Sequence, residues 1–427
     1  MHMQFSPKFR FIAGIATLSF VSLGVGHLYT QSKNQQQQLT FNQQAAAILP
    51  TTQTSLAGNL LNSPVSTAKA PNIFSQQVPP GSTPYRVIDE WKKYKFSVSG
   101  SQVFSQGKLP SAKVNFNHKD LLTVLVNTRK YFQDYAQEDP DIMSAGILAS
   151  QGVTVADVLK TLDFMISVLQ EDIAKNRATR LQDPNFINNN FRVIKWSAYN
   201  PETPNQKRLR LTKYAVFTHP GSRQKTSAYN IPIYSLKDNL ANDKFYTKYT
   251  KQDVLSGIYE PNGKEFGKVE PLAYLTRQGL EEALMEGTIL INFTDGTQAF
   301  FNVDRNNGMS YIRGLKATAQ KRYWYFKQVD AIKGYGYKID AKISIKPGVT
   351  FAGDVLNIGL GKLIVLEHNQ GGRKQLRMGI IADTGGAFLP NLHQLDFLAG
   401  IFQDKRDFGQ YIQQLPEYAN AYVLVKK

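Results

Sequence analysis

The segment that decides the fold is Arg377-Met-Gly-Ile-Ile-Ala-Asp-Thr-Gly-Gly-Ala-Phe388, in which an apolar run leads directly into Asp383 and two glycines follow it. The run predicts a buried strand, and the glycines predict a turn that a ligand can approach closely. We expect Ala382–Ala387 to be the active-site loop of a β-barrel enzyme. A carboxyl group beside apolar walls has a raised pKa, as a general acid at neutral pH requires. The alternative is an Asp that hydrogen-bonds within its own turn.

Other catalytic motifs are missing from the sequence. Aspartic proteases need two such aspartates, but Asp383 lies in the only Asp-Thr-Gly, and Asp295-Gly296-Thr297 has the wrong order, so a protease would have to be a dimer. The six histidines show no helical zinc spacing, and His393, ten residues after Asp383, is more typical of a surface histidine than of a cleft residue. Phosphate-binding loops, dinucleotide loops and serine-hydrolase motifs are also absent. We therefore expect no metal and no cofactor.

Composition narrows the class of protein. The 427 residues suffice for two or three domains, and the absence of cysteine excludes disulfides, thiolate chemistry, Cys-ligated zinc and lipidation on Cys. A net charge of +17 favours anionic partners such as membranes or acidic cell-wall polymers. Because no long Lys/Arg run occurs, we expect no nucleic-acid partner.

The N-terminus indicates export. Lys8 and Arg10 precede a mostly apolar run from Phe11 to about Tyr29, which is typical of a secretory signal and close to the length of a membrane span. We therefore expect residues 1–30 to be a signal peptide or a membrane anchor. Residues 31–84 are rich in Gln, Asn, Ser, Thr and Pro, which predicts a disordered linker.

The rest of the sequence predicts helices first and then, from Phe191 onwards, short strands. Helices are predicted at Leu121–Phe132 and Val155–Ile173, the second with Thr154 as N-cap and Asp157 closing a capping box. Asp295-Gly296 predicts a hairpin. The strands expected are Phe191–Trp196, Tyr214–Thr218, Thr288–Phe293, Gln298–Val303, Tyr323–Gln328, Lys362–Glu367, Arg377–Ala382 and Ala421–Val425. The predicted class is mainly β with N-terminal helices (α+β).

Several of these segments resemble the membrane-bound lytic murein transglycosylase A family, over roughly Leu121 to the C-terminus. The resemblance rests above all on the loop Ala382–Ala387, followed by His393-Gln-Leu-Asp-Phe-Leu-Ala-Gly400. Further similar segments are Gly353–Leu366, Tyr323–Phe326, Asn306–Tyr311, Arg223–Tyr234, the helix Val155–Ile173 and the strand Phe191–Trp196.

The resemblance implies a double-psi β-barrel with a second, inserted β-domain. The segments would be 85–205 (helical part of the barrel domain), 206–322 (inserted domain lining the glycan groove) and 323–427 (C-terminal barrel part). It implies cleavage of the MurNAc–GlcNAc bond of peptidoglycan to a 1,6-anhydromuramoyl end in the Gram-negative periplasm. The partners it implies are glycan strands, a membrane contacted through the N-terminal segment, and cell-wall enzyme complexes.

The resemblance also assigns residues. Asp383 would be acid and then base, and Asp396 would be the second catalytic carboxyl. Substrate contacts are expected from Asp354, Thr384, Gly385, Gly386, Asn307 and Tyr311. One carboxylate suffices because the nucleophile is the sugar's own 6-hydroxyl.

The groove motifs depart from the family's pattern. Ala215-Val-Phe-Thr-His-Pro220 stands where the family has Gly-Tyr-Tyr-Glu-Pro, and Phe388-Leu-Pro390 replaces Ile-Lys-Gly. Besides the enzyme, three alternatives therefore remain: a catalytically weak peptidoglycan-binding scaffold with the same barrel, the dimeric protease, and a generic exported β protein.

Overall fold

A computed structural model describes residues 98–240, 243–312, 314–385 and 391–427, all within the unit Pro80–Lys427. The predicted signal or anchor and the linker lie outside these residues, as does Gly386. The helices are α2 Gly100–Val103, α3 His118–Tyr135, α4 Val155–Ala174, α5 Pro184–Asn190, α6 Lys251–Leu255, α7 Arg277–Ala283 and α8 Lys405–Ile412. Short 3-10 turns are η2 Pro140–Ile142, η3 Gly146–Gln151, η4 Arg180–Gln182, η6 Phe245–Lys248, η7 Ala317–Ala319 and η8 Ile339–Ala341.

Strands make up most of the regular structure of this part of the chain. They are β1 Phe104–Gln106, β2 Val114–Asn115, β3 Phe191–Trp196, β4 Leu209–Gly221, β5 Ile231–Leu236, β6 Val269–Leu275, β7 Thr288–Phe293, β8 Gln298–Asn306, β9 Trp324–Val329, β10 Thr350–Ala352, β11 Leu363–Gln370, β12 Arg373–Asp383, β13 Gln394–Phe402 and β14 Tyr418–Lys426. The mixed class, mostly strands with some helices, is the one the sequence predicts.

Strand pairing closes part of the sheet on itself. The order is β1-β3-β14-β11-β12-β10-β13-β4-β7-β8-β9, and β4 pairs with β14 as well as with β13. The strands β14, β11, β12, β10, β13 and β4 therefore form a ring of pairings. Because each is hydrogen-bonded on both sides, none of the six leaves a free edge there.

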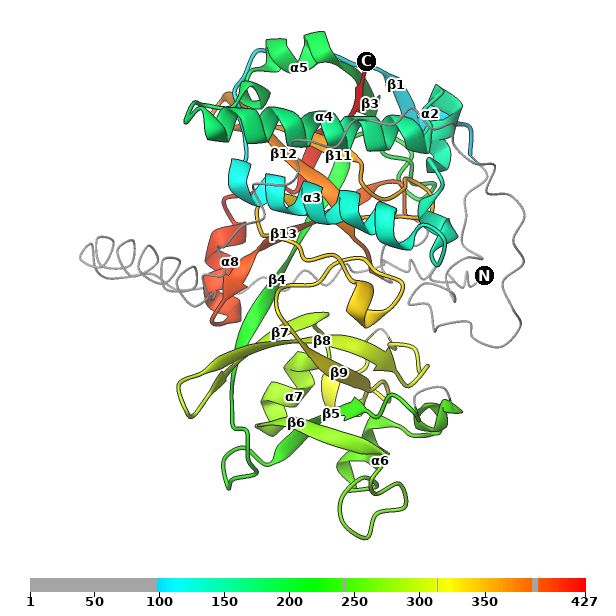
Figure 1. Ribbon diagram of the computed structural model, residues 1–427, viewed down its shortest axis with the longest axis vertical. Helices are drawn as coiled ribbons and strands as arrows, with labels where there is room; N and C mark the ends of the chain where they lie inside the picture. The colour runs from blue at the N-terminus through cyan, green and yellow to red at the C-terminus, as the bar shows by residue number, and fades with distance from the viewer. Residues whose placement is uncertain (1–97, 241–242, 313, 386–390) are drawn as a thin grey trace, which may run out of the picture. The chain divides into compact units, whose positions relative to one another are not determined.

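Two helices cover the ring in Figure 1: α3 and α4 lie side by side and pack on β12 and β14. The predicted capping box of α4 is present, since Thr154 accepts from the Asp157 amide while Asp157 accepts from the Thr154 amide. Four of the predicted core positions of α4 (Val158, Leu162, Met165 and Leu169) are buried, whereas Ile173 is only partly buried. The positions that the helical spacing predicts to be buried are therefore buried, except in the last turn of the helix.

Buried apolar residues form two clusters, and β4 joins them. Its first part pairs with β13, in the cluster covered by α3 and α4, and Thr218–Gly221 pair with β7 of the second cluster, beside α6 and α7 (Figure 1). The predicted hairpin at Asp295-Gly296 joins β7 to β8, with Gly296 at φ 82°. The segment boundaries at 205/206 and 322/323 stay a prediction.

Among the described residues, no single helix is long and apolar enough to cross a bilayer, and Pro140–Gln151 with α4 reaches that length only as a pair bent by 97°.

Candidate functional site

Four neighbouring strands bring the two predicted catalytic aspartates into one row. Asp383, the last residue of β12, pairs with Ala352 of β10, and Ala352 pairs in turn with Asp396 of β13. Asp396 pairs with Thr212 of β4. Residues paired across a sheet project from the same face, so both carboxyl groups stand on one face with only a methyl group between them. At strand spacings of about 4.8 Å, their Cα atoms are about 10 Å apart.

Both aspartates line a cavity of about 730 Å³. Ala352, Thr384 and Gly385 line it as well, together with Tyr214 from β4. Further walls come from β8, from the loop that precedes η8, and from the loop between β8 and β9: Asn302–Asn306, Ile332–Gly336 and Gly308–Tyr311. The cavity is thus built from the ring strands and from strands of the second cluster.

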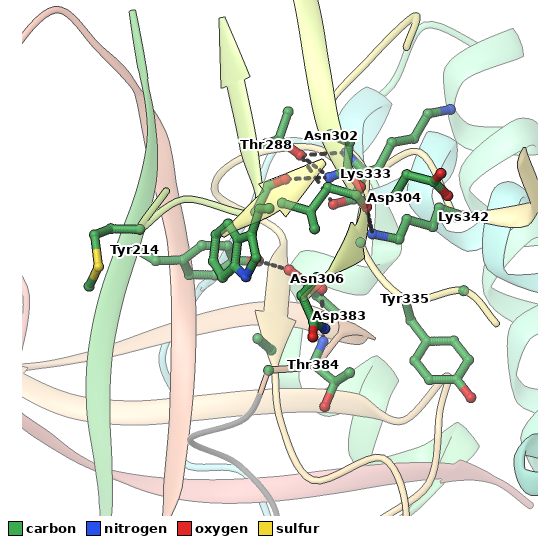
Figure 2. Close-up of a pocket in the computed structure, with 18 of the residues that line it drawn as sticks. Tyr214, Thr288, Asn302, Asp304, Asn306, Lys333, Tyr335, Lys342, Asp383 and Thr384 are labelled. Atoms are coloured by element: carbon green, nitrogen blue, oxygen red, sulfur yellow. Dashed lines mark hydrogen bonds between the residues drawn. The ribbon is translucent and has the colours of Figure 1, made fainter. Parts of the chain in front are cut away.

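Asp383 is held on both of its carboxyl oxygens. The Tyr214 hydroxyl donates to Oδ2 at 2.7 Å, and the Thr384 amide donates to Oδ1 at 2.8 Å (Figure 2). Burial raises the pKa of Asp383 to about 6, although these two hydrogen bonds and the charge of Lys342 favour the carboxylate. A carboxyl group with a pKa near neutrality can release and recover a proton, which is what an acid/base catalyst does.

Asp396 is less well satisfied. Its Oδ1 is buried and has no hydrogen-bond partner among the described residues. Burial raises the pKa of Asp396 to about 7; the nearby Thr212 hydroxyl lowers it, and the negative charge of Asp383 raises it further. Two interacting carboxyls of this kind titrate as a pair.

A lysine that the sequence did not single out faces Asp383 across the cavity (Figure 2). Lys342 donates from Nζ to Asn302 Oδ1 at 2.5 Å and to the Val303 carbonyl at 3.1 Å. Asn302 is itself fixed by hydrogen bonds to the Gly287 carbonyl and the Thr288 hydroxyl. Burial lowers the pKa of Lys342 to about 8, and the nearby Asp383 opposes this effect.

The backbone brings Lys342 and Asp383 together at a glycine. The Tyr335 amide donates to the Ala382 carbonyl at 2.9 Å, directly before Asp383. A Cβ on Gly334 would lie 2.5 Å from the same carbonyl oxygen. The loop therefore reaches β12 only because residue 334 lacks a side chain. Gly334 and Tyr335 also exchange hydrogen bonds with Ile343, the neighbour of Lys342.

Aromatic and basic residues line another part of the cavity wall. Arg322 stacks over Trp324 at 4.2 Å from the ring centroid and lies 5.3 Å from the centroid of Tyr311. All three line the cavity, and Tyr311 is 44% exposed. The predicted contact residue Tyr311 thus has the position expected of it, although contact with a substrate remains a prediction.

Two other predicted contact residues do not line the cavity. Asp354 is fully buried and accepts hydrogen bonds from the amides of Leu356, Asn357 and Asn391. Burial raises its pKa. Because its oxygens accept these backbone hydrogen bonds and one from the Asn357 side-chain amide, Asp354 ties its own segment to Asn391 and does not line the cavity.

Asn307 is the second such residue, 1% exposed. Its amide nitrogen donates to the carbonyls of Tyr249 and Lys321, and its Oδ1 accepts from the Tyr323 amide. Its neighbours Asn306 and Gly308 line the cavity instead. His393, only partly buried, does not line it either, as the surface interpretation expected.

Metal-binding potential is low in this part of the molecule. Among the described residues, no group of three or more His, Asp or Glu side chains could hold a metal ion.

Comparison with known proteins gives a clear result for the fold. The sequence matches no protein-family model and no curated protein. Crystal structures are similar: E. coli MltA with bound chitohexaose, at TM-score 0.52 and 15% identity, covers 81% of this chain and 99% of its own. The chain has an MltA-like fold. The membrane-bound lytic murein transglycosylase from Agrobacterium tumefaciens, at TM-score 0.53 and 14% identity, covers 76% of this chain and 98% of its own.

Tyr214 and Lys342 could not be identified from the sequence, because tertiary contacts alone bring them to Asp383. Tyr214 lies 169 residues before the aspartate to which it donates. Lys342 lies in a segment without a recognisable motif, and only the docking of the loop at Gly334 brings it to the cavity.

Proposed function

We propose that this protein is a lytic transglycosylase that cleaves the MurNAc–GlcNAc β-1,4 bond of peptidoglycan and leaves a 1,6-anhydromuramoyl end. The observation that carries the proposal is Asp383: a lone Asp-Thr-Gly-Gly carboxyl with a pKa near 6, held by Tyr214 at the wall of a large cavity. Support comes from the MltA-like fold, because E. coli MltA was crystallised with the glycan chitohexaose.

The proposed reaction uses one carboxyl group twice. Protonated Asp383 donates its proton to the glycosidic oxygen, the bond from that oxygen to C1 of MurNAc breaks, and the GlcNAc side leaves with a free 4-hydroxyl. The Asp383 carboxylate then removes the proton from the 6-hydroxyl of the same MurNAc, whose oxygen bonds to C1. Asp383 ends protonated, and no water is consumed. The intramolecular nucleophile replaces the second carboxylate of ordinary glycosidases.

The neighbours of Asp383 have complementary roles in this scheme. The Tyr214 hydroxyl and the Thr384 amide stabilise the carboxylate that forms after proton transfer. Asp396 either positions Asp383 or stabilises the positive charge that develops at C1, and its Oδ1 has no hydrogen-bond partner among the described residues. Gly385 leaves room for the sugar chain beside these groups.

Several finer assignments belong to the same proposal. The ring of strands would be a double-psi β-barrel, with 206–322 inserted between 85–205 and 323–427. The segment 1–30 would export the chain to the Gram-negative periplasm or tether it to a membrane, without lipid on Cys, and glycan strands would be its main partner. The net charge of +17 suits an anionic cell wall.

A digest of purified sacculi tests the proposal. Anhydro-muropeptides, detected by mass spectrometry, are expected from the wild-type sequence, and Asp383→Asn should lower their rate of formation at least about 100-fold without a change in thermal unfolding. Asp238→Asn is a matched control, because Asp238 is an exposed carboxylate that pairs with Lys327 outside the cavity.

The alternatives give different results in the same experiment. Binding to sacculi without anhydro products would favour a scaffold over an enzyme. Cleavage of a peptide substrate, blocked by a transition-state peptide inhibitor, would favour the dimeric protease. An Asp383→Asn variant with full activity would overturn the assignment of the catalytic group.

A further inference from the structure

Arg322, which lies just before β9, is on the cavity wall and has no carboxylate partner among the described residues. Its Nη2 donates to the Leu284 carbonyl at 2.9 Å and contacts Met285 Sδ at 3.5 Å. Nε and Nη1 form no hydrogen bond with a described residue, and no ion pair among the described residues includes Arg322. Two nitrogens of the guanidinium are therefore available to a ligand.

Other arginines of the second cluster are paired. Arg277 bonds Glu281, Arg305 bonds Asp304, and Arg223 bonds Asp295 while stacking on Phe293 at 4.0 Å. Arg322 has the same kind of stacked position, on Trp324, but lacks the acid. Because Arg322 is partly buried, the lack of a carboxylate partner costs free energy: the guanidinium loses hydration, and no counter-charge replaces it.

Two aromatic rings contact the guanidinium group of Arg322. Trp324 and Tyr311 hold the plane of the guanidinium, so its donors are fixed before a ligand arrives. Each of the two unpaired nitrogens, Nε and Nη1, can donate a charge-assisted hydrogen bond to a carboxylate. Asp383 lines the same cavity, so a glycan that spans the cavity can contact both Asp383 and Arg322.

We propose that Arg322 binds a carboxylate carried by the sugar chain and so determines which glycans the cavity prefers. This inference rests on the proposed function and names the acidic feature of its substrate. Muramyl residues carry a lactyl carboxylate, either free or extended by a peptide with carboxylates of its own, whereas chitohexaose carries no charge. The cavity therefore discriminates between two polymers with the same β-1,4-linked backbone.

Binding measurements with three tetrasaccharides of alternating GlcNAc and MurNAc test the inference. In the first, the lactyl carboxylates are free; in the second, they are converted to methyl amides; in the third, they carry a peptide stem. The full chain with Asp383→Asn prevents turnover. We expect a free carboxylate, lactyl or peptide, to bind at least about 10-fold more tightly than the methyl amide, and the preference to weaken with salt. The better of the first and third ligands identifies which carboxylate is bound.

Arg322→Gln in the same background should abolish this preference and leave chitohexaose affinity unchanged. Arg223 is also stacked on an aromatic ring, but it is paired with Asp295 and lies outside the cavity. The control variant Arg223→Gln should therefore keep the preference for a free carboxylate. Equal binding of all three tetrasaccharides by the Asp383→Asn protein that retains Arg322 overturns the inference without an Arg322 variant having to fold. An equal loss of chitohexaose binding in Arg322→Gln also overturns it, because Arg322 would then act by supporting Trp324.

Steady-state digestion separates this inference from the proposed function. With Asp383 intact, Arg322→Gln should raise KM for sacculi about 10-fold at nearly unchanged kcat. If anhydro products form but KM does not change, the function stands and the Arg322 inference fails. If no anhydro products form and no tetrasaccharide binds, both fail together.

Discussion

The hydroxyl of Tyr214 donates a 2.7 Å hydrogen bond to Oδ2 of Asp383, although the two residues come from strands on opposite sides of β10 and β13 in the sheet. The bond therefore links β4, the strand that contributes to both hydrophobic clusters, to Asp383, the last residue of β12. It stabilises the carboxylate and limits how far burial raises the pKa of Asp383.

Activity of the wild-type protein should fall as pH rises. A general acid must be protonated at the start, and the pKa of Asp383 is about 6. We therefore expect kcat/KM for sacculi to be highest below pH 6 and to decrease through pH 6–8. Rates of anhydro-muropeptide release from pH 4 to 9 measure this; a rate that increases up to pH 8 would contradict Asp383 as the acid.

Tyr214→Phe should shift the alkaline decrease of the rate to higher pH. The substitution removes a hydrogen bond to the charged form of Asp383, so the carboxyl holds its proton more strongly. A shift of about 1–2 pH units is expected, since a hydrogen bond to a charged group contributes about 1.5–3 kcal/mol. The complete pH profile is the measurement. Tyr418→Phe, outside the cavity, is the control, and an unshifted profile in Tyr214→Phe would show that the bond does not persist in solution.

Asp396→Asn should simplify the titration of the site. In the wild-type protein, the negative charge of Asp383 raises the pKa of Asp396, so two coupled ionisations occur near pH 6 and 7. The variant should show one, together with a decrease in kcat of about 10-fold or more. Carboxyl carbon chemical shifts, recorded by NMR against pH, report both steps. Two unchanged ionisations would exclude Asp396 from the pair.

Gly334→Ala should damage the site through the backbone. The new Cβ would lie 2.5 Å from the Ala382 carbonyl oxygen and 2.9 Å from Ile345 Cγ2, so the loop must move away from β12. We expect a loss of about 1–3 kcal/mol in the free energy of unfolding and a marked decrease in activity. Denaturant unfolding and sacculus digestion measure these effects. Gly287→Ala is the matched control, because this glycine also lines the cavity but has open space at its Cβ.

Lys362→Met should stabilise the protein near pH 7. Lys362 is 3% exposed, forms no ion pair with a described residue, and burial lowers its pKa to about 7 from 10.5. Between these values the unfolded chain binds more protons than the folded one, so this residue makes stability increase with pH from 7 towards 10. The variant should gain about 1–3 kcal/mol at pH 7, and less at pH 10.

Unfolding of Lys362→Met and wild type at pH 7, 8.5 and 10 tests that sign. Lys321→Met, which changes an exposed lysine, serves as control. A gain that does not shrink with pH would mean that the effect comes from packing rather than from titration.

Local patterns were sufficient for many elements of the fold. The capping box at Thr154 and Asp157, the Asp295-Gly296 hairpin and the strand leading into Asp383 each depend on neighbours within a few residues. Strand ends were less accurate: Tyr214–Thr218 was predicted where β4 runs Leu209–Gly221, since pairing with β13, β14 and β7 extends it. Short elements such as α8 and β6 have too little periodicity to be recognised.

The sequence by itself determined the catalytic candidate, because an acid at the end of an apolar strand, followed by glycines, is a local arrangement of side chain and backbone. It could not determine what surrounds that acid. Tyr214, Lys342 and Arg322 reach the cavity only through pairing of β4 with β13, docking of a loop at Gly334 and placement of β9. Tertiary structure also decided that Asp354 and Asn307 bind backbone groups. Both side chains are buried, and a buried polar group is stable only when it is hydrogen-bonded to a nearby partner.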